Sequence, residues 1–157
     1  MEIKDKELHR IAVTAIIHKD GKYLITKRSP HKKSFPNKWT VPGGGMEVDD
    51  YMNTPVSTKA GQWYYAIEKT LRREVKEEVN LEISKPKYLL DLTFITSDGT
   101  PSIVLSYYAE YISGEVILDK DSTEYKWVTA EEAKKIDLID GIAEEIGMAN
   151  KIIIGKE

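Results

Sequence analysis

The chain has 157 residues and a formal net charge of −3, with 41% hydrophobic and 31% charged residues. This length and composition predict a globular protein that buries enough apolar surface to fold without disulfides or a structural metal. Because cysteine is absent, thiolate metal centres, iron–sulfur clusters and cysteine nucleophiles are excluded. The near-neutral charge offers no broad basic surface for duplex nucleic acid. The charged N-terminal segment and the short apolar runs predict neither a signal peptide nor a membrane span, so we expect a cytoplasmic protein.

The first predicted elements are two strands, His9–Lys19 and Lys22–Arg28. The dipeptide Asp20-Gly21 between them favours positive φ and therefore predicts a tight antiparallel hairpin. The next stretch, from Ser29 to Pro42, contains three prolines and several lysines and predicts a loop. Three consecutive glycines, which we expect to extend that loop, follow at positions 43–45.

The clearest helix prediction covers Gln62–Val79. Apolar side chains recur there every four residues and trace one helical face, at Ile67, Leu71, Val75 and Val79. Asn80 should end the helix because asparagine readily adopts the left-handed conformation.

The second half of the chain predicts alternating strands and then two helices. The strands Tyr88–Ser97 and Ser102–Ser113 flank an Asp-Gly turn. The shorter elements are the strands Glu115–Leu118 and Tyr125–Thr129 and the helices Glu131–Ile136 and Gly141–Asn150. On the last helix, Ile142, Ile146 and Ala149 are expected to face inward. The pattern predicts an α/β (α+β) fold, a mixed sandwich around one sheet system.

The side chains best suited to catalysis or metal binding lie on the predicted helix. Glu74, Glu77 and Glu78 have the i, i+3, i+4 spacing that gathers three carboxylates on one face. This acidic stripe borders the apolar stripe, so we expect it to be partly desolvated and to need a cation, for which carboxylate oxygens favour Mg²⁺ or Mn²⁺. The alternative is a solvated helix face with neighbouring basic side chains as partners.

A glycine-rich segment, Trp39 to Asp50, lies upstream and could bring backbone groups close to a metal or a phosphate. Together with the acidic helix it resembles the Nudix box, G-x5-E-x7-R-E-U-x-E-E-x-G-U, in which U is a bulky aliphatic residue. Gly44 matches the first Gly, Asp50 the first Glu, and Arg73–Leu81 the second half. The flanking Trp-x-x-Pro-Gly-Gly and the strand Leu24–Arg28 look like the MutT-type branch of the family.

The chain departs from the box in three ways. Asp50 stands for Glu, Asn80 stands for Gly, and the 22 residues from 51 to 72 replace the seven of the pattern. The aromatic residues Trp63, Tyr64 and Tyr65 in this insertion could form a flap that stacks on a base, although packing is the more common use of such side chains.

The resemblance implies one Nudix hydrolase domain, residues 1–157, with an α/β/α sandwich, a mixed sheet and an inserted loop at about 51–65. It further implies a Mg²⁺-dependent hydrolase, with Mn²⁺ as a substitute. The substrate would be a nucleoside diphosphate linked to another moiety, most directly a nucleoside triphosphate, cleaved to a monophosphate and pyrophosphate.

The resemblance also implies roles for individual residues. The metal ligands would be Glu74, Glu77, Glu78 and the carbonyl of Gly43, and one of these carboxylates or a later acid would be the general base. Among Asp119, Asp121 and Glu124 we favour Glu124 as the later catalytic residue, acting as an additional metal ligand or as the base. Arg28 and Gly44 are expected to bind substrate. Structural roles are expected for Arg73, Trp39, Pro42 and Asp50.

Two alternatives remain at this point. The enzyme could act on ADP-ribose, a nucleotide sugar, a dinucleoside polyphosphate or a capped RNA. The domain could also be a non-catalytic nucleotide sensor or interaction module. A homodimer is compatible with the sequence but is not required for a chain of this length.

Overall fold

The computed structural model describes residues 2–156 and has a mixed sheet at its centre. The strands are β1 (Arg10–Lys19), β2 (Lys22–Arg28), β3 (Trp39–Thr40), β4 (Gly43–Gly45), β5 (Glu82–Ile83), β6 (Lys87–Ile95), β7 (Pro101–Ser113) and β8 (Ser122–Val128). The helices are the 3-10 helix η1 (Val48–Asp50) and the α-helices α1 (Ala66–Val79), α2 (Ala130–Ala133) and α3 (Ile142–Ile154).

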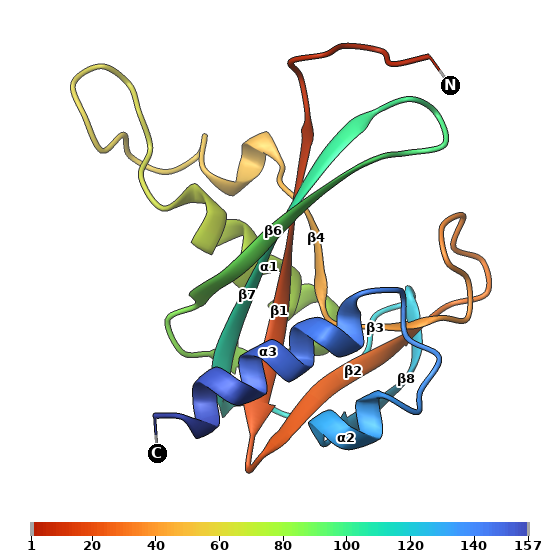
Figure 1. The fold of residues 1–157 in the computed structure, drawn as a ribbon. Helices are drawn as coiled ribbons and strands as arrows, with labels where there is room; N and C mark the ends of the chain where they lie inside the picture. Colours follow the sequence, from red (N-terminus) through yellow and green to blue (C-terminus); the bar gives the residue numbers. More distant parts are fainter. Residues whose placement is uncertain (1, 157) are drawn as a thin grey trace.

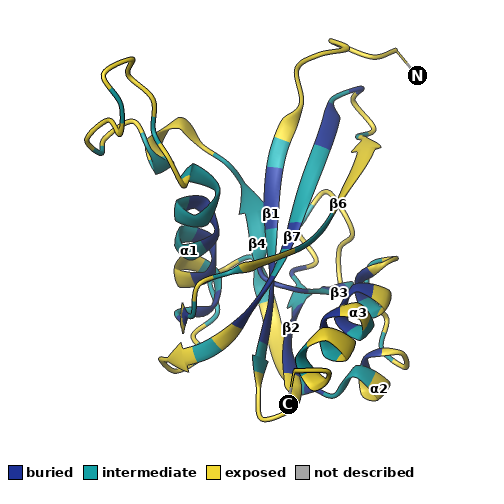
Figure 2. Ribbon diagram, turned by 60° about the vertical axis from the view of Figure 1, so that its left-hand side comes forward, coloured by how far each residue is buried: buried dark blue, intermediate teal, exposed yellow. Residues whose placement is uncertain are grey.

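The sheet runs in the order β3-β2-β1-β7-β5, with β4 paired to β1, β6 to β7 and β8 to β2. Strands β1 and β7 are parallel, whereas β2 and β4 lie antiparallel to β1. Helix α1 covers one face of this sheet and helices α2 and α3 cover the other (Figures 1 and 2). This arrangement confirms the predicted mixed sandwich.

Each face of the sheet has its own apolar core. On the α1 side, Leu71, Val75 and Val79 pack with strand residues such as Leu24. On the other side, α3 buries three side chains that the sequence pattern predicts to face inward, Ile142, Ile146 and Ala149. The core on the α1 side fixes the helix that carries the acidic residues.

Several local predictions are confirmed. Strands β1 and β2 form an antiparallel hairpin, and both turn residues have positive φ, 51° at Asp20 and 76° at Gly21. Asn80 ends α1 in the left-handed conformation with φ 62°. Strands β6 and β7 pair antiparallel, with Leu92 opposite Val104.

Other predictions are wrong in detail. The predicted loop from Ser29 to Gly45 contains two short strands, β3 and β4, because the glycines at 43–45 pair with β1 through backbone groups alone. Helix α1 begins at Ala66 rather than Gln62, since Tyr65 has φ 61° and cannot continue a right-handed helix. Glu115–Leu118 is not a strand.

Near the C-terminus, the observed ends of the strand and the helices differ from the predicted ends by a few residues. The last strand begins three residues before the predicted Tyr125, helix α2 ends at Ala133 rather than Ile136, and α3 continues past Asn150 to Ile154. Thr129 caps α2 by accepting a hydrogen bond from the Glu132 backbone N–H. Within residues 2–156 no helix combines the length and the apolar character needed to cross a bilayer.

The inserted segment, residues 51–65, extends away from the sheet at the N-terminal end of α1 (Figure 1). Its two ends meet where the rings of Tyr51 and Trp63 lie 5.3 Å apart. The indole N–H of Trp63 donates to the Thr54 carbonyl at 2.8 Å, and Lys69 of α1 donates to the Thr54 hydroxyl at 3.1 Å. These contacts form a closed stem at the base of the insertion.

Candidate active site

A pair of glutamates faces strand β4 from helix α1. Glu74 and Glu78 lie one helical turn apart, and Glu74 is only 9% exposed. The Gly43 backbone N–H donates to Glu78 Oε2 at 3.5 Å. A Cβ added at Gly44 would come within 2.5 Å of the Glu74 carboxylate oxygens, so only glycine lets the strand pass this close to the helix.

Burial changes the acid–base behaviour of Glu78. The pKa of Glu78 is raised by burial and, next, by the adjacent carboxylate of Glu74, although the Gly43 N–H opposes the shift. Two carboxylates held together away from water strongly favour either a shared proton or a cation. Their hard oxygen donors fit Mg²⁺ or Mn²⁺.

The third predicted ligand lies apart from this pair. Glu77 is exposed, and its carboxylate accepts a hydrogen bond from Arg73 Nη1 at 3.1 Å. Among residues 2–156 no three Asp, Glu or His side chains are gathered closely enough to form a ready metal site. The structure therefore brings together Glu74, Glu78 and the Gly43–Gly44 backbone, with Glu77 at the edge.

Arg73 lies behind the glutamate pair and binds several acceptors at once. Its Nη1 donates to Glu74 at 2.8 Å, its Nη2 donates to the Gly45 carbonyl at 3.0 Å, and its Nε contacts Asp50. These bonds raise the pKa of Arg73. With every arm of the guanidinium occupied by protein groups, Arg73 holds the helix against the glycine strand.

Asp50 keeps its place despite the insertion that follows it. Its side chain is 1% exposed, accepts from Arg73 Nη2 at 3.1 Å and accepts from Thr70 Oγ1 at 2.7 Å. The hydrogen bond from Arg73 is the main reason that the pKa of Asp50 falls to about 2. The Asp that stands for Glu thus stays ionised and bound to α1.

Two of the three later acids, Asp119 and Glu124, differ in position. The Asp119 backbone N–H donates to the Glu78 carbonyl at 3.2 Å, which places this residue at the C-terminal end of α1. The pKa of Asp119 is raised by burial and also by the negative charges of Asp121 and Glu77. The sequence favours Glu124 over Asp119, because spacing alone does not show which of these acids returns to the helix.

Glu124 lies away from the glutamate pair. It sits opposite Lys27 in the β2–β8 ladder, pairs with that ammonium group at 3.4 Å and has a side chain that is 54% exposed. Successive strand residues alternate between faces. Because Leu24 faces α1, Lys27 and the paired Glu124 face the other side of the sheet. The structure does not bring Glu124 to the glutamate pair.

Arg28 lies within the electrostatic reach of the site. Its Nε donates to the Ser34 carbonyl at 2.9 Å. Burial lowers the pKa of Arg28, and the negative charges of Glu78 and Asp121 partly restore it. The remaining donors on Arg28 are therefore close to the pair and can face an anion there.

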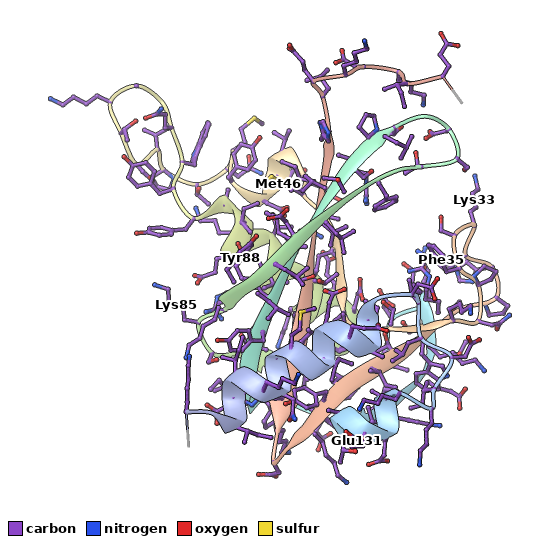
Figure 3. The ribbon with its side chains drawn as sticks, viewed as in Figure 1. Lys33, Phe35, Met46, Lys85, Tyr88 and Glu131 are labelled. Carbon is purple, nitrogen blue, oxygen red and sulfur yellow. The ribbon has the colours of Figure 1, made fainter. Side chains whose placement is uncertain are left out.

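The lysines near this site have other contacts. Lys32 pairs with Asp121 at 3.4 Å and Lys38 pairs with Asp137 at 2.6 Å. Lys33 lies on the projecting loop between β2 and β3 (Figure 3). Lys32 and Lys38 thus pair with acids other than the glutamate pair, and Lys33 is exposed to solvent.

Trp39 and Pro42 support the strand that carries the glycines. Trp39 is buried in the core on the α3 side, and its backbone N–H donates to the Asp137 carbonyl at 3.0 Å. The carbonyl of Pro42 accepts from the Ala15 N–H at 2.8 Å. Both residues fix the approach of the chain to Gly43.

The aromatic residues of the insertion divide into two groups. Trp63 packs on Tyr51 within the stem. Tyr64 and Tyr65 are 55% and 75% exposed, and their rings contact each other edge to face at 6.3 Å. Packing therefore accounts for Trp63 but not for the two tyrosines.

Comparison with known proteins identifies relatives of this chain. The family model described as NUDIX domain matches residues 8–146. Nucleoside triphosphatase NudI of Enterobacter sp. (strain 638) is 30% identical over 139 residues, covering 82% of this chain and 88% of that protein.

Solved structures share the fold. A MutT protein from Methanosarcina mazei Go1 superposes with a TM-score of 0.71 at 20% identity, covering 96% of this chain and 99% of that one. The NUDIX domain of Shewanella oneidensis NrtR, complexed with ADP ribose, gives a TM-score of 0.68 at 19% identity, covering 94% and 90%.

Proposed function

Because the chain belongs to the Nudix family of hydrolases, we propose that it cleaves nucleoside triphosphates to a nucleoside monophosphate and pyrophosphate. The observation that carries this proposal is the pair of buried Glu74 and half-buried Glu78 against the glycine strand, with Arg73 bound to Glu74. A relative named nucleoside triphosphatase, aligned over 82% of this chain, supports the choice of substrate.

We propose Mg²⁺ as the cofactor, with Mn²⁺ able to replace it. Glu74, Glu78 and the Gly43 carbonyl would hold the ion, and Glu77 would complete the set if it exchanged its bond with Arg73. The bound cation would neutralise negative charge that develops on the phosphates.

The remaining groups act on the phosphate chain and on water. Arg28 would bind phosphate oxygens, because it is the cation beside the pair that keeps free donors. Asp119 is our candidate general base, since its raised pKa suits a carboxylate that takes a proton from attacking water. Water would add to phosphorus, the anhydride bond to pyrophosphate would break, and the water proton would pass to Asp119 and then to solvent.

A matched pair of variants tests the base. Asp119→Asn should lower kcat for nucleoside triphosphates by about 10²–10⁴-fold, the usual contribution of a general base. Glu124→Gln, on the other face of the sheet, should leave kcat nearly unchanged. Circular dichroism would verify that both variants fold. Equal losses in the two variants, or a loss only in Glu124→Gln, would remove Asp119 from the mechanism.

The substrate needs a separate test. Turnover should be measured on the canonical triphosphates, ADP-ribose, a nucleotide sugar, a dinucleoside polyphosphate and a capped RNA, each with Mg²⁺ and with EDTA. We expect the highest kcat/KM on a triphosphate and none in EDTA. Turnover of ADP-ribose alone would refute the substrate while keeping the enzyme class. An inactive protein that still binds nucleotides would favour a sensor.

A further inference from the structure

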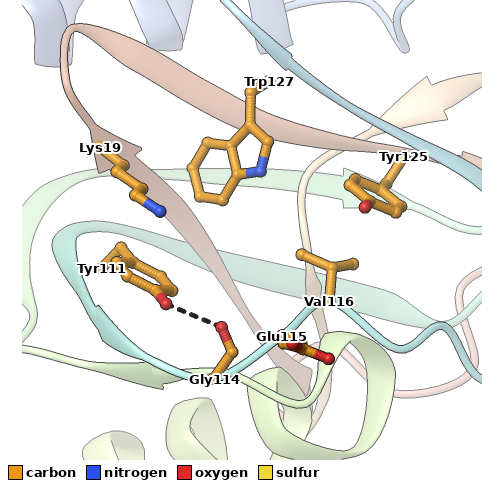
Figure 4. Close-up of a pocket in the computed structure, with 7 residues that line it drawn as sticks. All are labelled: Lys19, Tyr111, Gly114, Glu115, Val116, Tyr125 and Trp127. Carbon is orange, nitrogen blue, oxygen red and sulfur yellow. Dashed lines mark hydrogen bonds between the residues drawn. The ribbon is translucent and has the colours of Figure 1, made fainter.

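A cavity lies outside the glutamate site. It has a volume of about 310 Å³ and opens between β1, β7, β8 and the segment 114–116. Three aromatic side chains, Tyr111, Tyr125 and Trp127, contribute to its wall (Figure 4). None of the residues assigned to the proposed reaction lines it.

One side of this cavity is rigidly built. Tyr111 and Trp127 contact edge to face with ring centroids 6.2 Å apart. The Tyr111 hydroxyl donates to the Gly114 carbonyl at 2.8 Å, a bond that ties the strand to the following segment. Ring positions that are fixed before binding lower the entropy cost of receiving a ligand.

The other polar groups at the wall are available. In the described part of the chain, neither the indole N–H of Trp127 nor the hydroxyl of Tyr125 makes a hydrogen bond. Tyr125 is 45% exposed, so its ring and hydroxyl are open to solvent. The cavity therefore offers aromatic surface together with two unused donors.

The charges around the cavity balance. The Lys19 ammonium group lies 4.2 Å from the centroid of the Tyr111 ring, which already engages this cation. Glu115 supplies one negative charge at the same cavity. A site with one charge of each sign has no net attraction for a phosphate chain and suits an uncharged ligand.

We propose that this cavity is an accessory nucleoside-binding site, in which a nucleobase stacks on Trp127 and Tyr125 and accepts hydrogen bonds from their free donors. Loss of a base stack on an aromatic side chain should weaken binding by about 5- to 150-fold. The cavity volume lies at the small end of ligand sites, which suits one nucleoside better than a dinucleotide. This site goes beyond the proposed hydrolysis because it requires neither a phosphate nor a metal.

The accessory site and the glutamate pair share one stretch of chain. The wall residue Val116 is followed by Ile117, whose N–H donates to the Val79 carbonyl at 3.2 Å. Asp119 then donates to the Glu78 carbonyl. The two sites are thus separate but adjacent, and a test must distinguish them.

The test measures binding of adenosine, guanosine, cytidine and uridine by isothermal titration calorimetry in EDTA. Three proteins are compared: the unmodified chain, Tyr125→Ala and Glu78→Gln. We expect at least one nucleoside to bind the unmodified chain and Glu78→Gln equally, and to bind Tyr125→Ala about tenfold or more weakly. The matching 5′-monophosphate should bind no more tightly than the nucleoside. Thermal unfolding would verify that Tyr125→Ala is folded, as its exposure leads us to expect.

Tryptophan fluorescence supplies a second readout. Nucleoside addition should quench the emission of Trp127, and Trp127→Phe should abolish the quenching, because Trp39 and Trp63 lie in the other core and in the insertion. No saturable binding of any nucleoside up to about 5 mM would overturn the proposal. So would binding that Glu78→Gln removes and Tyr125→Ala preserves. Either result leaves the proposed hydrolysis intact, since turnover is measured separately.

Discussion

The ion pair between Asp50 and Arg73 should make a measurable contribution to stability. The bonds from Arg73 lower the pKa of Asp50 from an ordinary value near 3.8 to about 2. With the Asp50 side chain only 1% exposed, solvent screens this interaction little. The change in pKa corresponds to about 2.5 kcal/mol of folding free energy at neutral pH. Asp50→Asn removes the charge and keeps the volume, so it should lower the free energy of unfolding by about that amount.

The pH dependence of the stability lost in Asp50→Asn follows from the lowered pKa of Asp50. Since the folded state holds Asp50 at a lower pKa than the unfolded state, the stabilisation is complete well above pH 3.8 and disappears as the pH falls through about 2. The difference between the unmodified chain and Asp50→Asn should therefore decrease to about half its neutral value near pH 3.

Urea unfolding followed by circular dichroism at pH 7, 5 and 3 measures this difference. The control is Asp49→Asn, because Asp49 is the exposed neighbour of Asp50 and surface substitutions usually change stability by less than about 0.5 kcal/mol. The reasoning fails if both variants lose the same stability at pH 7. It also fails if the loss in Asp50→Asn is the same at pH 7 and at pH 3.

Three further predictions concern the site and its support. Glu78→Gln should raise the melting temperature in EDTA at neutral pH, because the raised pKa of Glu78 means that its ionised form opposes folding. Added Mg²⁺ should raise the melting temperature of the unmodified chain more than that of this variant, and differential scanning fluorimetry measures both changes. Gly44→Ala should lower kcat by about 10²-fold in steady-state assays, since the new Cβ would displace the Glu74 carboxylate. Trp63→Ala should raise the Mg²⁺ concentration for half-maximal activity by opening the stem, whereas the exposed Tyr64→Ala should not.

Local patterns predicted most of the fold. The Asp-Gly turn, the four-residue apolar repeat of α1 and the inward side of α3 each depend on short-range geometry that the sequence carries directly. The strand at residues 43–45 was not predicted, because a run of glycines has no alternation of apolar and polar side chains to detect. Only their backbone pairing with β1 reveals the strand.

The site was predicted less completely than the fold. The i, i+4 spacing correctly placed Glu74 and Glu78 on one side of α1. It could not show that Glu77 turns to Arg73, because that choice depends on an arginine with four competing acceptors. The position of Asp119 depends on a segment without regular structure, whose path is set by its bonds to the end of the helix.

The insertion raises the question of how a box interrupted by 15 extra residues still forms. Closing a loop of 22 residues instead of seven costs about 1 kcal/mol more, because each doubling of loop length costs about 0.6 kcal/mol. The contribution of about 2.5 kcal/mol predicted for the ion pair at the base of the loop exceeds this cost. The contact between Tyr51, which directly follows Asp50, and Trp63 closes the loop a second time. The spacing between Asp50 and Arg73 along the chain can therefore vary, provided that these contacts hold the two residues together in space.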